Sequence, residues 1–122
     1  IMSKAAVSMV VFGIYLIIIG IGFLVIPNVL LKMLGFPTTN EPWINVIGML
    51  VLILAFYYIQ SARNELTTFF RFTVLARSSV IVFFVVFVLI DLAQPMLILF
   101  GIVDLVAAVW TALALRSSNP SP

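Results

Sequence analysis

The chain has 122 residues, of which 65% are hydrophobic and only 8% are charged. A water-soluble domain of this size needs more polar surface, so the composition predicts an integral membrane protein. The formal net charge of +2 comes from few, scattered basic residues, which excludes a nucleic-acid-binding surface. The sequence contains neither cysteine nor histidine, so thiol redox chemistry is excluded and we expect no metal site and no cofactor.

The first apolar run covers residues 5–26 and stops at Pro27. About 20 apolar residues cross the hydrocarbon core of a bilayer, so this run predicts a transmembrane helix. It is too long for the apolar part of a signal peptide and lacks a small-residue cleavage site. We therefore expect it to be retained as a helix.

A short amphipathic segment follows the first span. Within residues 27–42, four apolar side chains recur at helical spacing: Val29, Leu30, Met33 and Leu34. Lys32 lies beside them, and Gly35 is suited to end a helix. The pattern predicts a short interfacial helix that lies on the membrane surface, and the alternative is a plain loop.

Three further apolar runs cover residues 43–62, 69–90 and 95–115. The connections between them, RNELTT and DLAQ, are so short that consecutive spans must be antiparallel neighbours. The sequence therefore predicts an all-α integral membrane fold, a four-transmembrane-helix bundle with up-down-up-down topology. We assign residues 1–116 to a single membrane domain and residues 117–122 to a disordered tail.

Basic residues predict the orientation of this bundle. The side that holds both termini carries four of them, Lys4, Arg63, Arg71 and Arg116, and the other side has only Lys32. By the positive-inside rule we expect a multi-pass protein of the cell inner (plasma) membrane with both termini in the cytoplasm. On the opposite side, we expect Asp91 to cap the start of the fourth helix, with Gln94 completing a capping box.

Two charged residues interrupt the apolar spans. Asp104 lies eleven residues before Leu115, about 16 Å deep, and Arg77 lies eight residues after Phe69, about 12 Å deep from the same side. An isolated charge at such a depth is costly, and the two spans are antiparallel neighbours, so we expect Arg77 and Asp104 to pair across the helix interface. A buried pair of this kind either fixes the helix register or serves a function, and both interpretations remain open.

Further polar residues lie near the expected pair. We place Tyr57 and Gln60 of the second span, together with Ser78, in one ligand-binding or buried polar cluster with Arg77 and Asp104, and we predict no catalytic residue. A stripe of small residues on the fourth span turns Asp104 toward the bundle and allows close helix packing: Gly101, Ala108, and either Thr111 or Ala112.

Two sequence motifs support a resemblance to a known family. Residues 27–37 read P-x-x-L-L-x-x-L-G-F-P, and residues 104–115 read D-L-x-x-A-x-W-T-x-L-A-L; the second span also has a basic end at Arg63. The chain resembles the small bacterial four-helix membrane proteins of the DoxX-like type. The resemblance implies a compact helical bundle. The name-giving subunit is associated with thiosulfate oxidation coupled to quinone, but this chain has no cysteine and no recognisable oxidation site.

We favour a non-enzymatic function: the bundle binds a hydrophobic ligand, a lipid or a quinone, or acts as an accessory subunit of a larger membrane complex. One alternative is a quinone-linked oxidoreductase subunit, in which the polar cluster would bind and protonate a quinone carbonyl. Another is a small transporter or channel that works as an oligomer, because four spans alone make a poor aqueous path. The expected partners are membrane lipids, a quinone, and further copies of the chain or a larger complex.

Overall fold

The computed structural model describes residues 2–118, and this part of the chain contains five helices and no strand. They are α1 Lys4–Val25, α2 Pro27–Leu34, α3 Trp43–Arg63, α4 Thr67–Leu89 and α5 Met96–Ser118. All except α2 are long and apolar enough to cross a membrane. The predicted fold class is therefore confirmed, including the short helix that follows the first span.

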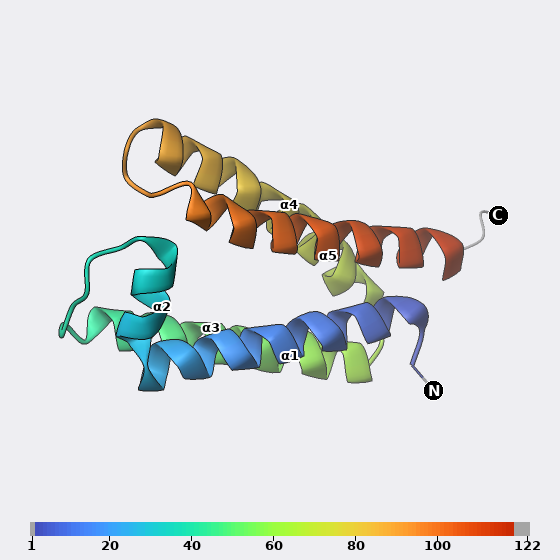
Figure 1. Cartoon of the computed structure of the whole chain (residues 1–122). Coiled ribbons are helices and arrows are strands. Elements are labelled where there is room, and N and C mark those ends of the chain that lie inside the picture. The colour runs from blue at the N-terminus through green and yellow to red at the C-terminus, as the bar shows by residue number, and fades with distance from the viewer. Residues whose placement is uncertain (1, 119–122) are drawn as a thin grey trace.

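The four long helices form two antiparallel pairs (Figure 1). α1 packs along α3, α4 packs along α5, and α1 also contacts α5, which joins the two pairs. α1 begins and α5 ends at one end of the bundle, whereas α2 and the loop after it lie at the other end. The pairs diverge toward the end that holds α2, so α2 stands beside the widest separation between them.

Small residues allow α1 and α3 to pack closely. A Cβ atom built on Gly48 would lie 2.8 Å from the carbonyl oxygen of Gly20, and one built on Gly20 would lie 3.0 Å from the carbonyl oxygen of Gly48. Only glycine permits this approach, which resembles the small-residue contacts common between transmembrane helices. Asn45 strengthens the same interface, because its side-chain amide donates to the carbonyl oxygens of Phe23 and Leu24 at the end of α1.

The short helix α2 begins and ends as its sequence predicts. Pro27 occupies its first position, where a missing N–H costs nothing. Gly35 follows it in the left-handed conformation, with φ of 83°, and its N–H donates to the carbonyl oxygens of Leu31 and Lys32. A Cβ atom on Gly35 would lie 2.5 Å from Cγ of Gln94, so the end of α2 rests against the connection between α4 and α5.

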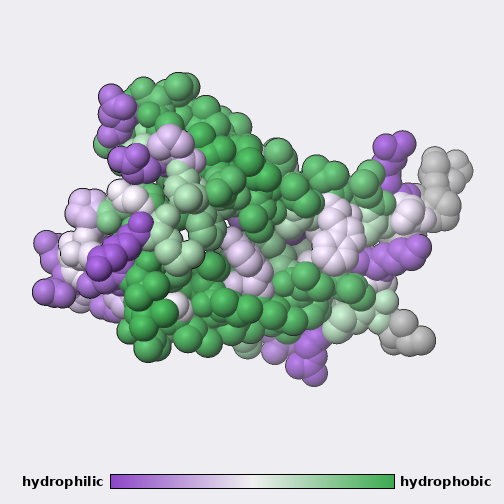
Figure 2. Space-filling view, viewed as in Figure 1, coloured by the Kyte–Doolittle hydropathy of each residue, from purple (hydrophilic) through white to green (hydrophobic). Residues whose placement is uncertain are grey.

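The outer surface matches a bilayer environment (Figure 2). Apolar residues cover the middle of the visible face, and polar residues gather at its two ends. The most exposed large side chains include Val25, Leu75 and Leu89, each more than two-thirds exposed. Such a surface is stable against lipid tails and unstable in water.

Two details differ from the sequence-based expectations. α5 continues through Ser118, so the first two residues of the expected tail are helical, and residues 119–122 lie outside the described residues. The expectation that Asp91 caps the start of the fourth span, which is α5, is wrong. Asp91 follows the end of α4 with a φ of 63°, and α5 begins only at Met96, which is too far along the chain for that cap.

Candidate functional site

Arg77 lies in the middle of α4 and is almost completely buried, with 2% of its surface exposed. Its Nε donates to the carbonyl oxygen of Thr73 at 3.3 Å, and its Nη2 donates to the Thr73 hydroxyl at 3.0 Å. Nη2 also donates to the Thr111 hydroxyl of α5 at 2.9 Å and approaches the sulfur of Met9 at 3.5 Å. The guanidinium is thus held against its own helix and tied to two others.

The Thr111 hydroxyl extends this network to α1. Its oxygen lies 2.6 Å from the hydroxyl oxygen of Ser8, which donates to the carbonyl oxygen of Ala5 at 2.6 Å. A hydroxyl has a single hydrogen, so Ser8 must accept from Thr111, and Thr111 accepts from Arg77. The direction of the chain of hydrogen bonds is therefore set, from the cation on α4 through α5 to the backbone of α1.

Two aromatic rings cover the guanidinium. Its central carbon lies 4.9 Å from the ring centroid of Phe12 and 5.5 Å from that of Tyr58. Cation–π attraction offsets part of the cost of removing the charge from water. The remaining nitrogen, Nη1, is buried and has no hydrogen-bond partner among residues 2–118. One strong donor of Arg77 is therefore not used by the described protein.

Asp104 lies on α5, half-buried and turned into the bundle, as its small-residue stripe predicts. Within the described part of the chain its carboxylate makes neither an ion pair with Arg77 nor a hydrogen bond. The structure therefore does not contain the expected direct pair: Nε and Nη2 of Arg77 are directed to Thr73 and Thr111, and Nη1 has no hydrogen-bond partner among residues 2–118. Both residues nevertheless line one cavity.

Three cavities follow one another from this polar centre toward α2. The inner cavity, of about 270 Å³, is lined by Arg77, Asp104 and mostly apolar side chains, and it opens at the outer surface beside Phe72, which is 67% exposed. The middle cavity, of about 230 Å³, shares Leu16 and Asp104 with the inner one and is otherwise lined by apolar and aromatic residues. Asp104 therefore marks the junction between the two cavities.

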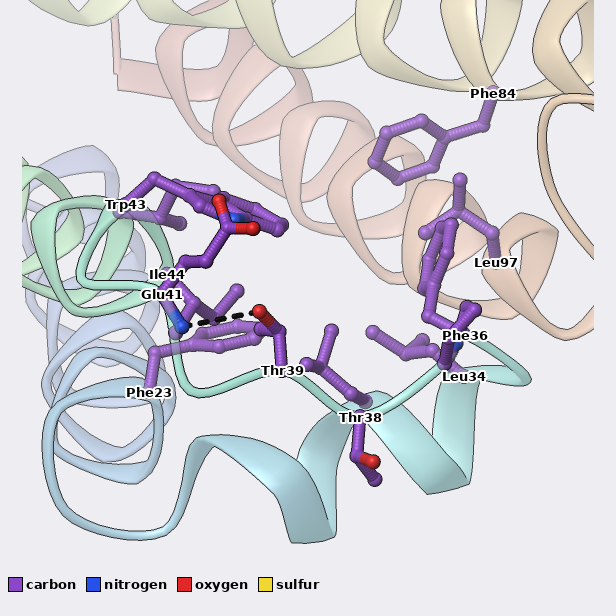
Figure 3. Close-up of a pocket in the computed structure, with 13 residues that line it drawn as sticks. Phe23, Leu34, Phe36, Thr38, Thr39, Glu41, Trp43, Ile44, Phe84 and Leu97 are labelled. Carbon is purple, nitrogen blue, oxygen red and sulfur yellow. Dashed lines mark hydrogen bonds between the residues drawn. The ribbon is translucent and has the colours of Figure 1, made fainter.

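The outer cavity is the largest, with a volume of about 690 Å³ (Figure 3). It shares four residues with the middle cavity: Phe23, Leu34, Phe84 and Leu97. Phe84 and Leu97 come from the α4–α5 pair, and they face Trp43 and Ile44 of α3 across the cavity. The loop after α2 closes one side, with polar groups from Thr39 and Glu41 at its rim.

Not every residue of the predicted polar cluster lies at this centre. Tyr57 is 54% exposed and packs its ring edge against Phe56 on the outer surface of α3. Gln60 and Ser78 are half-buried, and neither is among the residues that line the three cavities. Arg77 and Asp104 are the two predicted residues that the fold brings to one cavity.

The structure adds polar and aromatic residues that the sequence-based prediction missed. Thr73 lies four residues before Arg77 and therefore on the same helix face, a spacing that could have identified it. Tyr58 lines the inner cavity, whereas the adjacent Tyr57 does not, because neighbouring helical positions differ by about 100° around the axis. Ser8 belongs to α1, and its sequence context gives no signal of the contact with Thr111.

The fold and the site define a class: a small helical protein with four membrane-length helices, in which two charged residues, Arg77 and Asp104, line a cavity. Comparison with known protein families, with characterised proteins and with solved structures finds no match.

Proposed function

We propose that this protein is a non-enzymatic membrane protein whose bundle binds a hydrophobic ligand, a lipid or a quinone. The observation that carries the proposal is the pair of charged residues, Arg77 and Asp104, that line the inner cavity. There, a buried cation keeps an unused donor and a carboxylate keeps unused acceptors, beside an apolar cavity. Unsatisfied charged groups inside a membrane protein are costly, and a bound ligand with a polar head would offset that cost.

The size and lining of the cavities support the same proposal. Small-molecule sites in proteins are commonly about 300–1,000 Å³, mostly apolar, with a few polar groups that orient the ligand. The outer cavity falls in this range, and the middle and inner cavities extend it toward Asp104 and Arg77. A ligand chain would lie in the apolar part and its head at the charged end. We also propose a multi-pass arrangement in the inner membrane with both termini in the cytoplasm.

The test is mass spectrometry of the molecules that stay bound after extraction in a mild detergent, with a matched pair of variants. Ile19 lines the middle cavity, whereas the adjacent Ile18 is 65% exposed on the surface of α1. We expect a lipid or quinone to be retained by the wild type and by Ile18→Phe, and to be lost from Ile19→Phe, whose added ring fills the cavity. Equal retention by both variants would show that the bound molecule lies on the outer surface and would contradict the proposal.

An accessory-subunit function would give a different result in the same experiment. A larger protein would be extracted together with the chain, and its retention would not depend on Ile19→Phe. The proposed DoxX-like relationship rests on the motifs at residues 27–37 and 104–115. The first of these motifs forms α2 and the start of the loop after it, where Gly35 lies against Gln94.

A further inference from the structure

We infer that the ligand is a neutral, single-chain lipid whose head carries a hydroxyl group, bound with the hydroxyl at Asp104 and the end of the chain near Trp43. The inference rests on the proposed function and deepens it, because it names the class of ligand and its orientation.

The charge of the inner cavity argues for a neutral head. Arg77 and Asp104 are the two charged residues that line this cavity, and their charges cancel. An anionic or cationic head would leave one uncompensated charge in a medium of low dielectric constant, which is strongly unfavourable. A neutral head keeps the balance that the two side chains already provide.

The unused hydrogen-bonding groups argue for a head that both donates and accepts. Nη1 of Arg77 is buried without an acceptor. The Asp104 carboxylate lines the inner and the middle cavity and has no hydrogen-bond donor among residues 2–118. A hydroxyl supplies both functions in one group. A quinone carbonyl supplies only an acceptor and would leave the carboxylate without a partner, so a hydroxyl-bearing lipid fits this pair of side chains better.

The order of the cavities sets the orientation. Asp104 lines both the inner and the middle cavity, and the middle cavity shares four lining side chains with the outer one. From Asp104 to the start of α5 at Met96 is eight residues, or about 12 Å along the helix. A single chain that follows this direction reaches the outer cavity, whose wall includes Trp43, beneath the loop after α2.

The two tryptophans make this orientation measurable. Trp43 lines the outer cavity, whereas Trp110 lines a groove at the other end of the bundle together with Met2 and Lys4. In a Trp110→Phe variant the fluorescence reports on Trp43 alone, and Trp43→Phe gives the matched control. The probes are a long-chain alcohol with bromine on its terminal carbon, the corresponding fatty acid at a pH where it is ionised, and the corresponding bromoalkane without a head.

We expect the bromo-alcohol to quench Trp43 saturably and to leave Trp110 unchanged. It should bind at least about tenfold more tightly than the ionised acid, as expected for one hydrogen bond to a charged group. In Asp104→Asn the cavity keeps the Arg77 cation without its counter-charge, so the preference should reverse and the acid should bind more tightly than the alcohol. Loss of structure would remove the saturable quenching of Trp43 by either probe, so a reversed preference separates the change of charge from misfolding.

The possible failures are distinguishable. If the headless bromoalkane binds as tightly as the alcohol, the cavity accepts chains and the proposed function stands, but the inference about the head is wrong. If the acid is preferred by the wild type, the inference is also wrong. If no probe quenches Trp43 saturably, both the inference and the proposed function are contradicted.

Discussion

The guanidinium of Arg77 and the hydroxyl of Thr111 are joined by a hydrogen bond of 2.9 Å that links α4 to α5 inside the bundle. Thr111 passes this link to Ser8 of α1 at 2.6 Å. All three residues are buried. One cation is therefore anchored by hydroxyls from its own helix and from a second helix, while the carboxylate of Asp104 remains available to the cavity.

Replacing Thr111 tests whether this link stabilises the bundle. Thr111→Val keeps the shape of the side chain but removes the acceptor for Arg77 and the donor for Ser8. We expect a loss of about 1–2 kcal/mol in the free energy of unfolding. Hydrogen bonds to charged groups contribute more than this in many proteins, but hydrogen bonds between membrane helices contribute less on average. Thr111→Ser keeps the hydroxyl and should cost less. Unfolding in mixed detergent micelles measures both, and equal losses for Val and Ser would contradict the role of the hydroxyl.

Arg77 and Asp104 should be energetically coupled although they are not in contact. Arg77→Met leaves the carboxylate in the bundle without an opposite charge, and we expect it to cost about 3 kcal/mol. The double variant Arg77→Met with Asp104→Leu removes both charges and should recover much of that loss. A double-mutant cycle in which the two single losses simply add would mean that the charges do not compensate each other.

Gly35 should hold α2 in place through two separate effects. Its positive φ disfavours any other residue, and a Cβ atom there would meet Gln94 at 2.5 Å. We expect Gly35→Ala to loosen α2 and to increase hydrogen exchange in residues 27–34. Adding Gln94→Ala should restore only part of the protection, because it removes the Cγ atom but leaves the Cβ atom of residue 94 at 2.9 Å and leaves the backbone strain. Unchanged exchange in Gly35→Ala would show that this contact does not position α2.

The connection between α3 and α4 should give the stability a dependence on pH. The hydroxyl and the backbone N–H of Ser3 both donate to the Glu65 carboxylate, at 2.7 and 2.8 Å, and these bonds lower the pKa of Glu65. Because the pKa of Glu65 is lower in the folded protein, its ionised carboxylate stabilises the fold at any pH above the usual pKa of a glutamate. This contribution is lost as the pH falls through the lowered pKa. Glu65→Gln should therefore be less stable than the wild type at neutral pH, and the difference should shrink in acid. A constant difference in thermal midpoint would contradict this assignment.

The orientation in the membrane is testable because the natural chain has no cysteine. Ser117→Cys lies at the end of the bundle where α1 begins and α5 ends, and Thr38→Cys lies in the loop at the opposite end. In intact cells, a membrane-impermeant thiol reagent should label Thr38→Cys and should label Ser117→Cys only after the membrane is opened. The reverse pattern would place the termini outside the cytoplasm.

The sequence predicts the fold well because its strongest signals are physical necessities of a bilayer. Runs of apolar residues of sufficient length, interrupted at Pro27, Arg63 and Asp91, define the spans to within about three residues of the observed helices. Pro27 and Gly35 act on the backbone locally, so they also predict the limits of α2. These features depend on neighbours in the sequence and not on how the helices pack.

The centre of the bundle is less predictable, because it depends on the rotation of each helix about its axis. Arg77 and Asp104 are identified by the cost of charge in a membrane, whatever their partners. Whether Tyr57 or Tyr58 faces Arg77 depends on the packing of α3 against α1, which the sequence of α3 alone does not determine. The sequence likewise does not determine that the hydroxyls of Thr73 and Thr111, and not the carboxylate of Asp104, are the hydrogen-bond partners of Arg77. Hydroxyls are common in apolar spans, and only the packed helices show which of them meet.

Photo-crosslinking in intact membranes tests most directly whether the bundle interior holds a ligand. A photoreactive amino acid would be placed at Ile19, which lines the middle cavity, and in a matched protein at Ile18, which faces outward. We expect the probe at Ile19 to capture one lipid or quinone species, identified by mass spectrometry, and the probe at Ile18 to capture the mixed lipids of the bulk membrane. The same mixture of bulk lipids at both positions would contradict a ligand site inside the bundle.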